Sequence, residues 1–327
     1  MSFSSEVKEE LSAKIDSARH CRIAQAAAML HACGWAGQGA VGIRTENAFA
    51  AKAFGLCLSK IIGREAVTEK TEGTKRGGSL TVRTASLEDA EKLLSAVRMD
   101  SGEDFLSGGV LSDLSGRKID HTLIQKSCCK KAFIRGAFLT SGSLSDPRRS
   151  YHFEIVCHDE NAAALMAELL SSLSFDARCV TRKPRSASAH ERHVVYLKEG
   201  EQISDLLGAM GAYQSLMALE NARIVRNIAG TVNRQVNCET ANLKKTVDAA
   251  VRQTEDIRYL DEKIGLGTLS EPLRAAAYLR LEMPDATLSE LSAASDPPVG
   301  KSGINHRLGK LSRMAEELRK TEELRDT

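Results

Sequence analysis

CRIAQAAAMLHACG, residues 21–34, and CCKKAFIRGAFLTSG, residues 128–142, are the two stretches that decide the fold of this chain. Both consist mainly of small and apolar residues that favour a helix. Each ends on a glycine, Gly34 or Gly142, and a glycine at this place is typical of the left-handed position that follows a helix. We therefore expect two matching helices, one in each half of a repeated unit.

The same order of elements is expected after each of these helices. Hydrophobic alternation and periodicity predict a strand, then a helix, then a β-hairpin and a closing helix. In the first half these elements fall at residues 41–45, 47–62, 66–68 paired with 79–83 through a turn at 72–78, and 87–97; in the second half they fall at residues 151–157, 160–173, 178–181 paired with 193–198, and 202–210. An order that repeats at an offset of about 110 residues indicates a duplicated α/β unit. The Gly- and Ser-rich residues 101–115 would link its halves.

Length and composition are those of a folded protein with more than one domain. Of the 327 residues, 42% are hydrophobic and 27% are charged, which excludes a disordered chain. The charged N-terminus has no apolar core of a secretion signal, and no stretch approaches the ~18 apolar residues of a membrane helix. We therefore expect a cytoplasmic protein with no membrane partner. The net charge of +2 says little about nucleic acid, since affinity depends on where positive charge concentrates.

The cysteines form no recognisable metal-binding pattern. They are scattered without a CxxC pair, and most lie among apolar residues, so we expect reduced thiols that behave as small hydrophobic side chains. A site at His152, Cys157 and His158 is disfavoured because its spacing matches no common ligand pattern and a strand sends neighbouring side chains to opposite faces. The sequence thus predicts no metal and no cofactor. The cysteines are Cys21, Cys33, Cys57, Cys128, Cys129, Cys157, Cys179 and Cys238.

A helical module is expected in the last third of the chain, from near Ala218 to the C-terminus. Residues 273–281 have one apolar face, and the sequence TLSE at residues 287–290 has the form of a capping box. Pro297 and Pro298 must end that second helix before a third begins near residue 302. This is the pattern of a helix-turn-helix at about residues 273–318. The apolar stripe of the third helix consists of Ile304, Leu308, Leu311, Ala315 and Leu318.

The opposite face of the third helix favours contact with DNA. It offers hydrogen-bonding and cationic groups, and residues 299–314 contain four cations and no acid. The alternative is an ordinary solvated face, because the helix-turn-helix also occurs in proteins that bind no DNA. The candidate DNA-contacting residues are Lys301, Ser302, Asn305, His306, Arg307, Gly309, Lys310 and Arg313.

A second basic cluster lies at residues 220–245, which contain only two acids. Two interpretations stay open. Its asparagines, which lower helix propensity, cap helix ends where the helical module joins the duplicated domain, or the cluster contacts phosphates. Its cations are Arg223, Arg226, Arg234, Lys244 and Lys245, and its asparagines include Asn227, Asn233, Asn237 and Asn242.

Three segments, FIRGAFLTSGSLSDP at residues 133–147, NRQVNCETANLKKTVDAAVRQTEDI at residues 233–257 and PPVGKSGINHRLGKL at residues 297–311, closely resemble the WhiA family of sporulation and cell-division regulators of Gram-positive bacteria. The resemblance extends over nearly the whole chain. It implies an α+β fold in which a duplicated LAGLIDADG homing-endonuclease-like domain precedes an all-α helix-turn-helix domain, distantly similar to the promoter-reading part of sigma factors. The boundaries expected are an N-terminal helix at 1–20, the degenerate LAGLIDADG-like domain at 21–215, with halves at about 21–105 and 120–215, and the helical DNA-binding domain at 218–327.

The resemblance also implies where a nuclease would carry its acids. In LAGLIDADG nucleases the eighth motif position of each half supplies a carboxylate that holds divalent metal. Here these positions fall on Cys33 and Ser141, and neutral thiol and hydroxyl groups bind Mg²⁺ poorly. Asp146 and Glu46 lie nearby in sequence but are better explained as surface turn residues. We therefore expect no nuclease activity and no catalytic residues.

The leading hypothesis is a transcription regulator that contacts double-stranded promoter DNA through the third helix and acts in cell division, chromosome segregation or sporulation. It would lie in the cytoplasm at the nucleoid, and the family suggests a sigma factor, RNA polymerase or another regulator as partner. One rival is a scaffold that docks on sigma factor or RNA polymerase with little direct DNA contact. Another is a metal-dependent endonuclease, which the missing acids disfavour.

Overall fold

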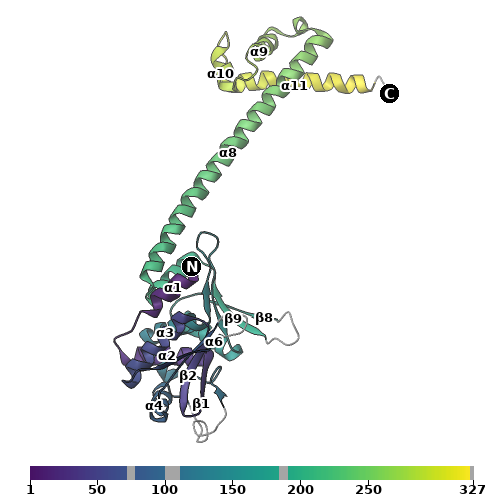
Figure 1. The fold of residues 1–327 in the computed structure, drawn as a ribbon. Helices are drawn as coiled ribbons and strands as arrows, with labels where there is room; N and C mark the ends of the chain where they lie inside the picture. The colour runs from purple at the N-terminus through teal and green to yellow at the C-terminus, as the bar shows by residue number, and fades with distance from the viewer. Residues whose placement is uncertain (72–77, 100–110, 184–190, 325–327) are drawn as a thin grey trace. The chain divides into compact units, whose positions relative to one another are not determined.

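The computed structural model describes residues 1–71, 78–99, 111–183 and 191–324, and the chain divides into two compact units, residues 1–227 and 228–327 (Figure 1). The helices that belong to the first unit are α1 (Phe3–Ser12), α2 (Arg19–Cys33), α3 (Ala48–Ile62), α4 (Leu87–Val97), α5 (Ser127–Ser141), α6 (Glu160–Ser171) and α7 (Gly200–Met210). The strands are β1 (Gly34–Gly37), β2 (Ala40–Thr45), β3 (Val67–Thr71), β4 (Ser79–Arg83), β5 (Ser112–Asp113), β6 (Gly142–Leu144), β7 (Phe153–Cys157), β8 (Arg178–Arg182) and β9 (Arg192–Leu197). The long α8 (Tyr213–Ile264) leads to α9 (Glu271–Glu282), α10 (Leu288–Ala294) and α11 (Lys301–Glu323).

Each half of the first unit builds one antiparallel sheet. The strands pair in the order β3-β4-β2-β1-β5 in the first half and β6-β7-β9-β8 in the second, so β8-β9-β7-β6 repeats β3-β4-β2-β1. The registers also correspond, because Gly34 lies opposite Ile43 in one half and Gly142 lies opposite Ile155 in the other. The prediction of a duplicated α/β unit is confirmed.

The two halves meet where α2 packs against α5. Gly136 on α5 lies against the backbone of α2, and a Cβ there would be 2.5 Å from the carbonyl oxygen of Gln25 and 3.0 Å from the Cβ of Ala28. Ala24 and Ala132 are buried on the facing sides of the two helices. The distance between packed helices depends on the side chains at the contact, so these small residues allow an unusually close approach.

A buried arginine ties this helix pair to the rest of the first unit. The guanidinium of Arg135, 2% exposed, donates from Nε to Gln25 Oε1 at 2.9 Å and from Nη1 to the Met210 carbonyl oxygen at 3.0 Å. Its Nη2 pairs with the Asp16 carboxylate. These partners lie on α2, at the end of α7 and in the connection before α2. A buried guanidinium needs such partners because an unpaired buried charge is strongly destabilising.

The glycines that end α2 and α5 are extended rather than left-handed, so that part of the prediction is wrong. Gly34 has φ −80° and ψ 153°, and Gly142 has φ −84° and ψ 156°. Each glycine starts a strand directly from the helix. A Cβ on Gly34 would lie 2.4 Å from the Leu30 carbonyl oxygen, and one on Gly142 would lie 2.3 Å from the Phe138 ring. Glycine stands at both positions because the sharp exit leaves no room for a side chain.

The N-terminal segment differs from the single helix expected over residues 1–20. α1 ends at Ser12 and α2 begins at Arg19. Between them, Arg22 Nη1 donates to the carbonyl oxygens of Asp16, at 2.9 Å, and Ser17, at 2.8 Å. These bonds, together with the Arg135 ion pair, hold Asp16 in a connection instead of a helix.

Helix α8 runs from the first unit into the second. Leu219 belongs to the core of the first unit, whereas Ile257 and Leu260 belong to the core of the second. The boundary between the units, after Asn227, falls later than the predicted start near Ala218, because the first turns of α8 pack on the first unit. The interpretation of the four asparagines as caps is wrong, since the helix continues through all of them and their side chains are exposed.

Several expectations concern shorter segments. β1 and β6 were not predicted, because strands of 4 and 3 residues that begin with glycine give no periodicity to detect. The predicted turn at residues 72–77 and residues 101–110 of the predicted link lie outside the described residues. No helix in the described ranges has both the length and the apolar composition that a membrane span requires.

Gly136→Ala is expected to lower the free energy of unfolding of the first unit by about 1–3 kcal/mol, because the new methyl group must push α2 and α5 apart. The control is Gly55→Ala on α3, where the nearest atom to a new Cβ is 3.6 Å away. That variant should be neutral or stabilise by about 0.5–1 kcal/mol through helix propensity. Chemical denaturation followed by the fluorescence of Trp35, the one tryptophan in the chain, measures both. Equal effects of the two substitutions would contradict the close-packing argument.

Candidate nucleic-acid interface

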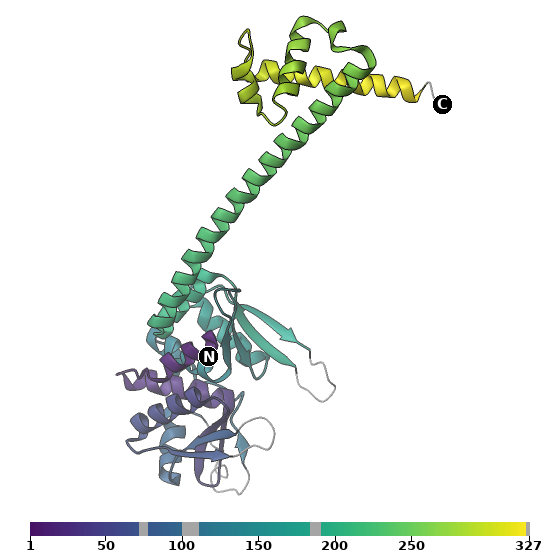
Figure 2. The same ribbon diagram turned by 45° about the horizontal axis from the view of Figure 1, so that its top comes forward.

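Helices α9, α10 and α11 pack with the end of α8 into one apolar core (Figure 2). The stripe predicted for the third helix is buried: Ile304, Leu308, Leu311 and Ala315 are each at most 1% exposed. Leu318, the last residue of the stripe, is half-buried. The remaining core residues are Ile257, Leu260, Leu266, Leu269, Leu273, Ala276, Ala277 and Leu291.

A buried arginine shapes the turn between α9 and α10. Arg280 is 2% exposed, and its Nη1 donates to the carbonyl oxygens of Met283 at 3.4 Å, Pro284 at 3.3 Å and Ala286 at 2.7 Å. One guanidinium group therefore donates hydrogen bonds to three backbone carbonyl groups in the turn directly after α9. Such groups need partners when they are removed from water.

Side-chain hydrogen bonds set the start of α10 and the turn that follows it. Thr287 and Glu290 form the predicted capping box, in which each side chain accepts a hydrogen bond from the backbone N–H of the other. After α10, Ser292 Oγ donates to the Val299 carbonyl oxygen at 2.6 Å, and Val299 N–H donates to Ser295 Oγ at 2.8 Å. These bonds fix where α11 begins relative to α10.

Ion pairs hold the far end of α11 on α8, which it crosses in Figure 2. Arg319 Nη1 lies 2.7 Å from the carboxylate of Asp256, which is 2% exposed. The Arg319 guanidinium also covers the ring of Tyr259, with 4.6 Å between the guanidinium carbon and the ring centre. Glu322 accepts from Tyr259 Oη at 2.7 Å and pairs with Lys263 Nζ at 2.7 Å. The orientation of α11 within the second unit is thus fixed at both ends.

The first half of α11 presents the predicted DNA-contacting residues. Arg307 and Gly309 are half-buried, and the predicted residues that are exposed are Lys301, Ser302, Asn305, His306, Lys310 and Arg313. Nothing lies within 4 Å of a Cβ built on Gly309, so this position leaves open space beside the helix. Arg313 Nε donates to the Gly309 carbonyl oxygen at 3.2 Å, which directs that guanidinium along the same face.

A cleft of about 430 Å³ joins the start of α11 to α8. Lys245 from α8 and Lys301 and Asn305 from α11 line it, so two residues of the third helix and one of the second basic cluster share a site. Gln253 also lines the cleft, and its Oε1 is buried with no hydrogen-bond partner. None of the lining residues is acidic. The full lining is Lys245, Thr246, Ala249, Ala250, Gln253, Arg280, Thr287, Leu288, Ser289, Lys301 and Asn305.

The rest of the second basic cluster is divided between the units. Arg223 and Arg226 lie in the first unit, where Arg223 Nη1 is 2.5 Å from Glu220 and the guanidinium of Arg226 covers the Tyr151 ring at 5.1 Å. Arg234 and Lys244 are exposed on α8 within the second unit. The structure therefore brings Lys245, but neither Arg223 nor Arg226, to the cleft.

Sequence reasoning missed Gln253, Thr246 and Ser289 as members of this cleft. Gln253 and Thr246 lie on α8, far from the helix-turn-helix pattern in sequence. The sequence pattern identifies Ser289 only as part of the capping box. Their common feature is their position where four helices, α8, α9, α10 and α11, meet, which depends on how α8 packs and leaves no periodic pattern in the sequence.

The two positions that would carry catalytic acids lie at the C-terminal ends of α2 and α5. Cys33 Sγ donates to the Met29 carbonyl oxygen at 3.5 Å, and Ser141 Oγ donates to the Ala137 carbonyl oxygen at 3.2 Å. Burial raises the pKa of the Cys33 thiol to about 12, so it stays neutral near pH 7. Both groups are hydrogen-bonded within their own helices and offer no negative ligand to a metal ion.

Neither the nearby acids Glu46 and Asp146 nor the disfavoured metal site at His152, Cys157 and His158 changes the conclusion that the two motif positions offer no negative ligand. Glu46 is exposed, and Asp146 caps a turn by accepting from the Arg148 N–H at 2.9 Å. His152 Nε2 lies 3.0 Å from Glu154, while Cys157 is buried in the core. Within the described ranges, the one group of at least three His, Cys, Asp or Glu side chains close enough to share a metal ion lies elsewhere, at the opposite ends of α2 and α5.

A LAGLIDADG-like α+β domain followed by a helical helix-turn-helix domain defines the class of this protein. The family model of the WhiA LAGLIDADG-like domain matches residues 130–229, and that of the WhiA C-terminal HTH domain matches residues 232–315. "Probable cell division protein WhiA" of Lachnospira eligens is 41% identical over 326 residues, which cover 98% of each chain. The protein of the same name from Desulforamulus reducens is 39% identical over 331 residues, which cover 99% of this chain and 98% of the relative. The chain belongs to the WhiA family.

A solved structure shares the fold. The crystal structure of full-length WhiA from Thermatoga maritima matches 97% of this chain and 99% of its own, with a TM-score of 0.53 and 22% sequence identity. The predicted fold class, a LAGLIDADG-like domain followed by a helix-turn-helix domain, is confirmed.

Arg280→Ala is expected to destabilise the second unit by about 3 kcal/mol, because the carbonyl oxygens of residues 283, 284 and 286 lose their donor and a cavity opens. Arg258→Ala, on an exposed site of α8, is the matched control and should change stability by less than about 0.5 kcal/mol. Thermal unfolding followed by far-ultraviolet circular dichroism, with Trp35 fluorescence reporting the first unit separately, distinguishes the units. A loss of stability equal to that of Arg258→Ala would show that Arg280 does not hold the turn.

Proposed function

We propose that this chain binds double-stranded promoter DNA through the first half of α11 and regulates transcription without cutting DNA. The observation that carries the proposal is the absence of acids among the residues lining the cleft at the start of α11, where the exposed Lys245 and Lys301 and the buried Arg280 are the cations. A surface with positive charge alone attracts the phosphate backbone, and phosphate contacts supply most of the affinity for DNA.

The residue types on this face divide into two roles. Lys301, Lys310 and Arg313 supply charge to phosphates, which positions the helix but carries no sequence information. Asn305 and His306, exposed one turn into α11, have the donors and acceptors that read base edges in the major groove. In a helix-turn-helix the N-terminal residues of the recognition helix make such contacts. Ser302 and Arg307 would add hydrogen bonds, and Gly309 would let the backbone approach.

The cleft extends this surface onto α8. Lys245 and the unpaired Oε1 of Gln253 stand beside Lys301 and Asn305. The exposed Lys244 and Arg234 on α8 would add backbone contacts. Arg223 and Arg226, already engaged by Glu220 and Tyr151, are the weakest members of the predicted DNA-binding set.

The first unit is proposed to supply a second contact surface in place of a nuclease centre. Arg178 and Arg192, at the ends of the paired strands β8 and β9, are exposed and would suit DNA. A docking face for sigma factor or RNA polymerase is the alternative use of this unit. Relatives at about 40% identity are named probable cell division proteins, so we place the target promoters in cell division, chromosome segregation or sporulation, with the protein in the cytoplasm at the nucleoid.

Lys301→Ala and Lys310→Ala should each weaken DNA binding about fivefold at ~150 mM salt and lower the slope of log affinity against log salt by about 0.9, the effect of losing one phosphate contact. Lys320→Ala, an exposed lysine near the far end of the same helix, is the control and should leave both quantities unchanged. Fluorescence anisotropy with a promoter fragment found by genomic footprinting, at several salt concentrations, makes the measurement. A DNA affinity of the wild-type protein that does not change with salt concentration would contradict the proposal and favour the protein-docking scaffold.

No cleavage of supercoiled or linear DNA is expected in the presence of Mg²⁺ or Mn²⁺, because Cys33 and Ser141 leave no carboxylate pair to hold the metal. Incubation of the full-length protein with plasmid carrying its binding site, followed by denaturing gel electrophoresis, detects single-strand and double-strand breaks. A chelator-treated sample is the control. Metal-dependent breaks at the bound site would show that other acids replace the missing pair.

A further inference from the structure

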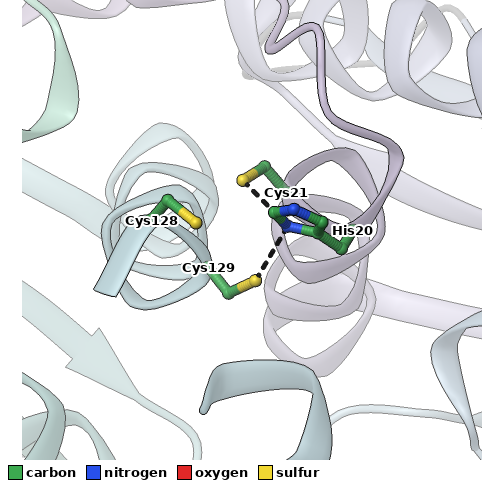
Figure 3. Close-up of side chains that lie close together, drawn as sticks. All are labelled: His20, Cys21, Cys128 and Cys129. Atoms are coloured by element: carbon green, nitrogen blue, oxygen red, sulfur yellow. Dashed lines mark hydrogen bonds between the residues drawn. The ribbon is translucent and has the colours of Figure 1, made fainter. Parts of the chain in front are cut away.

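Four side chains with metal-binding atoms meet at the N-terminal ends of α2 and α5. His20 and Cys21 come from the first turn of α2, and Cys128 and Cys129 come from the first turn of α5 (Figure 3). The Nδ1 atom of His20 lies 3.2 Å from Cys129 Sγ and 3.3 Å from Cys21 Sγ. All four potential ligand atoms lie within 4.8 Å of one another.

This arrangement is close to the ligand set of a tetrahedral zinc site. Zinc bound by thiolates at about 2.3 Å and by a histidine nitrogen at about 2.0 Å spaces its ligand atoms roughly 3.3–3.8 Å apart. The two N–S distances, 3.2 and 3.3 Å, are slightly shorter than the roughly 3.5 Å that these bond lengths give for a nitrogen and a sulfur at the tetrahedral angle. The other separations need a contraction of at most about 1 Å, which rotation of the side chains can supply. Three cysteines and one histidine are a common donor set of structural zinc.

The cluster follows the pseudo-symmetry of the fold. His20 and Cys21 precede Gly34 by 14 and 13 residues, and Cys128 and Cys129 precede Gly142 by the same numbers. The four ligands therefore occupy two equivalent positions on each of two equivalent helices. Close packing of α2 on α5 through Gly136 brings these positions together without any CxxC spacing in the sequence.

Two opposing electrostatic effects act on the thiol groups of the cluster. Cys21 and Cys129 lie in the first turns of their helices, whose positive ends favour negative charge, and neither helix has a side-chain cap on its first N–H groups. Without a cation, burial and the neighbouring Cys128 raise the pKa of Cys21 to about 12. A divalent cation would compensate for the effects of burial and of Cys128 on the Cys21 thiol, since a coordinating thiol is deprotonated by its metal.

Solvent reaches the cluster. His20 and Cys128 are exposed, whereas Cys21 and Cys129 are 4% and 3% exposed. A cleft of about 600 Å³ opens beside them, lined in part by His20 and Cys129. Buried cysteines often act only as small apolar side chains, but that role explains neither the two exposed members nor a histidine nitrogen directed between two sulfur atoms.

We propose that His20, Cys21, Cys128 and Cys129 bind one Zn²⁺ ion, which clamps the N-terminal ends of α2 and α5. The ion would fasten the two halves of the first unit at the end of the helix pair that lies away from Cys33 and Ser141. Its role is structural, because four protein ligands leave no open position for a substrate. The proposal does not depend on DNA binding by the second unit.

The test uses the full-length protein purified under reducing conditions. Elemental analysis should find about one zinc per chain. After removal of the metal by a chelator, titration with Co²⁺ should give thiolate-to-cobalt charge-transfer absorption and the intense visible bands of tetrahedral coordination. Zinc should raise the melting temperature of the metal-free protein, because an ion bound only by the folded state stabilises it.

Substitutions of the two exposed ligands keep the core intact. His20→Ala and Cys128→Ser should each weaken Zn²⁺ binding by more than about 100-fold, measured by competition with a chromophoric chelator, because losing a ligand costs more than losing an outer-shell partner. Cys179→Ser, an exposed cysteine of the same unit, should bind Zn²⁺ like the wild-type protein. Weak octahedral cobalt bands, wild-type protein without bound zinc, a disulfide within the cluster, or equal loss of zinc in Cys179→Ser would each overturn the proposal.

Discussion

The close contact between α2 and α5 is the constraint on which the first unit depends. Gly136 lets the helix backbones meet, and Arg135, one residue earlier, is buried by that contact and must be neutralised. Its three partners come from α2, from the connection before α2 and from the end of α7. The charge thus enforces the packing, because any rearrangement that separates these segments leaves a buried guanidinium without partners. Both sheets start from the helix ends that this contact positions.

The contact between α2 and α5 does not require acids at the two motif positions, Cys33 and Ser141. In a LAGLIDADG nuclease the helix pair also brings two acids together, and the small residues at the interface are required for that geometry. Here the small residues remain, while Cys33 and Ser141 bond to carbonyl groups of their own helices. The packing is maintained by Gly136 and Arg135, so the acids can be lost without loss of the fold. In the function proposed above, the unit would serve as a scaffold for surfaces such as the exposed strand β8.

Periodic features were predictable from the sequence, and features that depend on close approach were not. The stripe of α11 and the capping box of α10 were found because helix geometry repeats every few residues. The backbone conformation of Gly34 could not be predicted from the sequence, because glycine is needed both where a helix ends in a left-handed turn and where a helix turns directly into a strand. Of the two interpretations of the asparagines of α8, the one as helix caps is wrong because exposed polar residues lower helix propensity without ending a long helix. The cluster at His20 was missed because its members are separated by more than a hundred residues and meet only through Gly136.

The contribution that the cations of α11 can make to the proposed DNA binding depends on whether α11 is already ordered before binding. Lys301, Lys310 and Arg313 would contribute little if α11 had to be ordered on binding, because that ordering would offset the gain from phosphate contacts. Arg280 and the serine-mediated turn fix the start of α11, and Asp256 holds its far end through Arg319. Arg280 and Asp256 are buried, and together with the half-buried Ser292 and Ser295 they keep the exposed side chains of α11 at constant spacing. Replacing a cation on the surface should therefore change binding alone, whereas replacing Asp256 should change both folding and binding, since it moves every contact of α11 together.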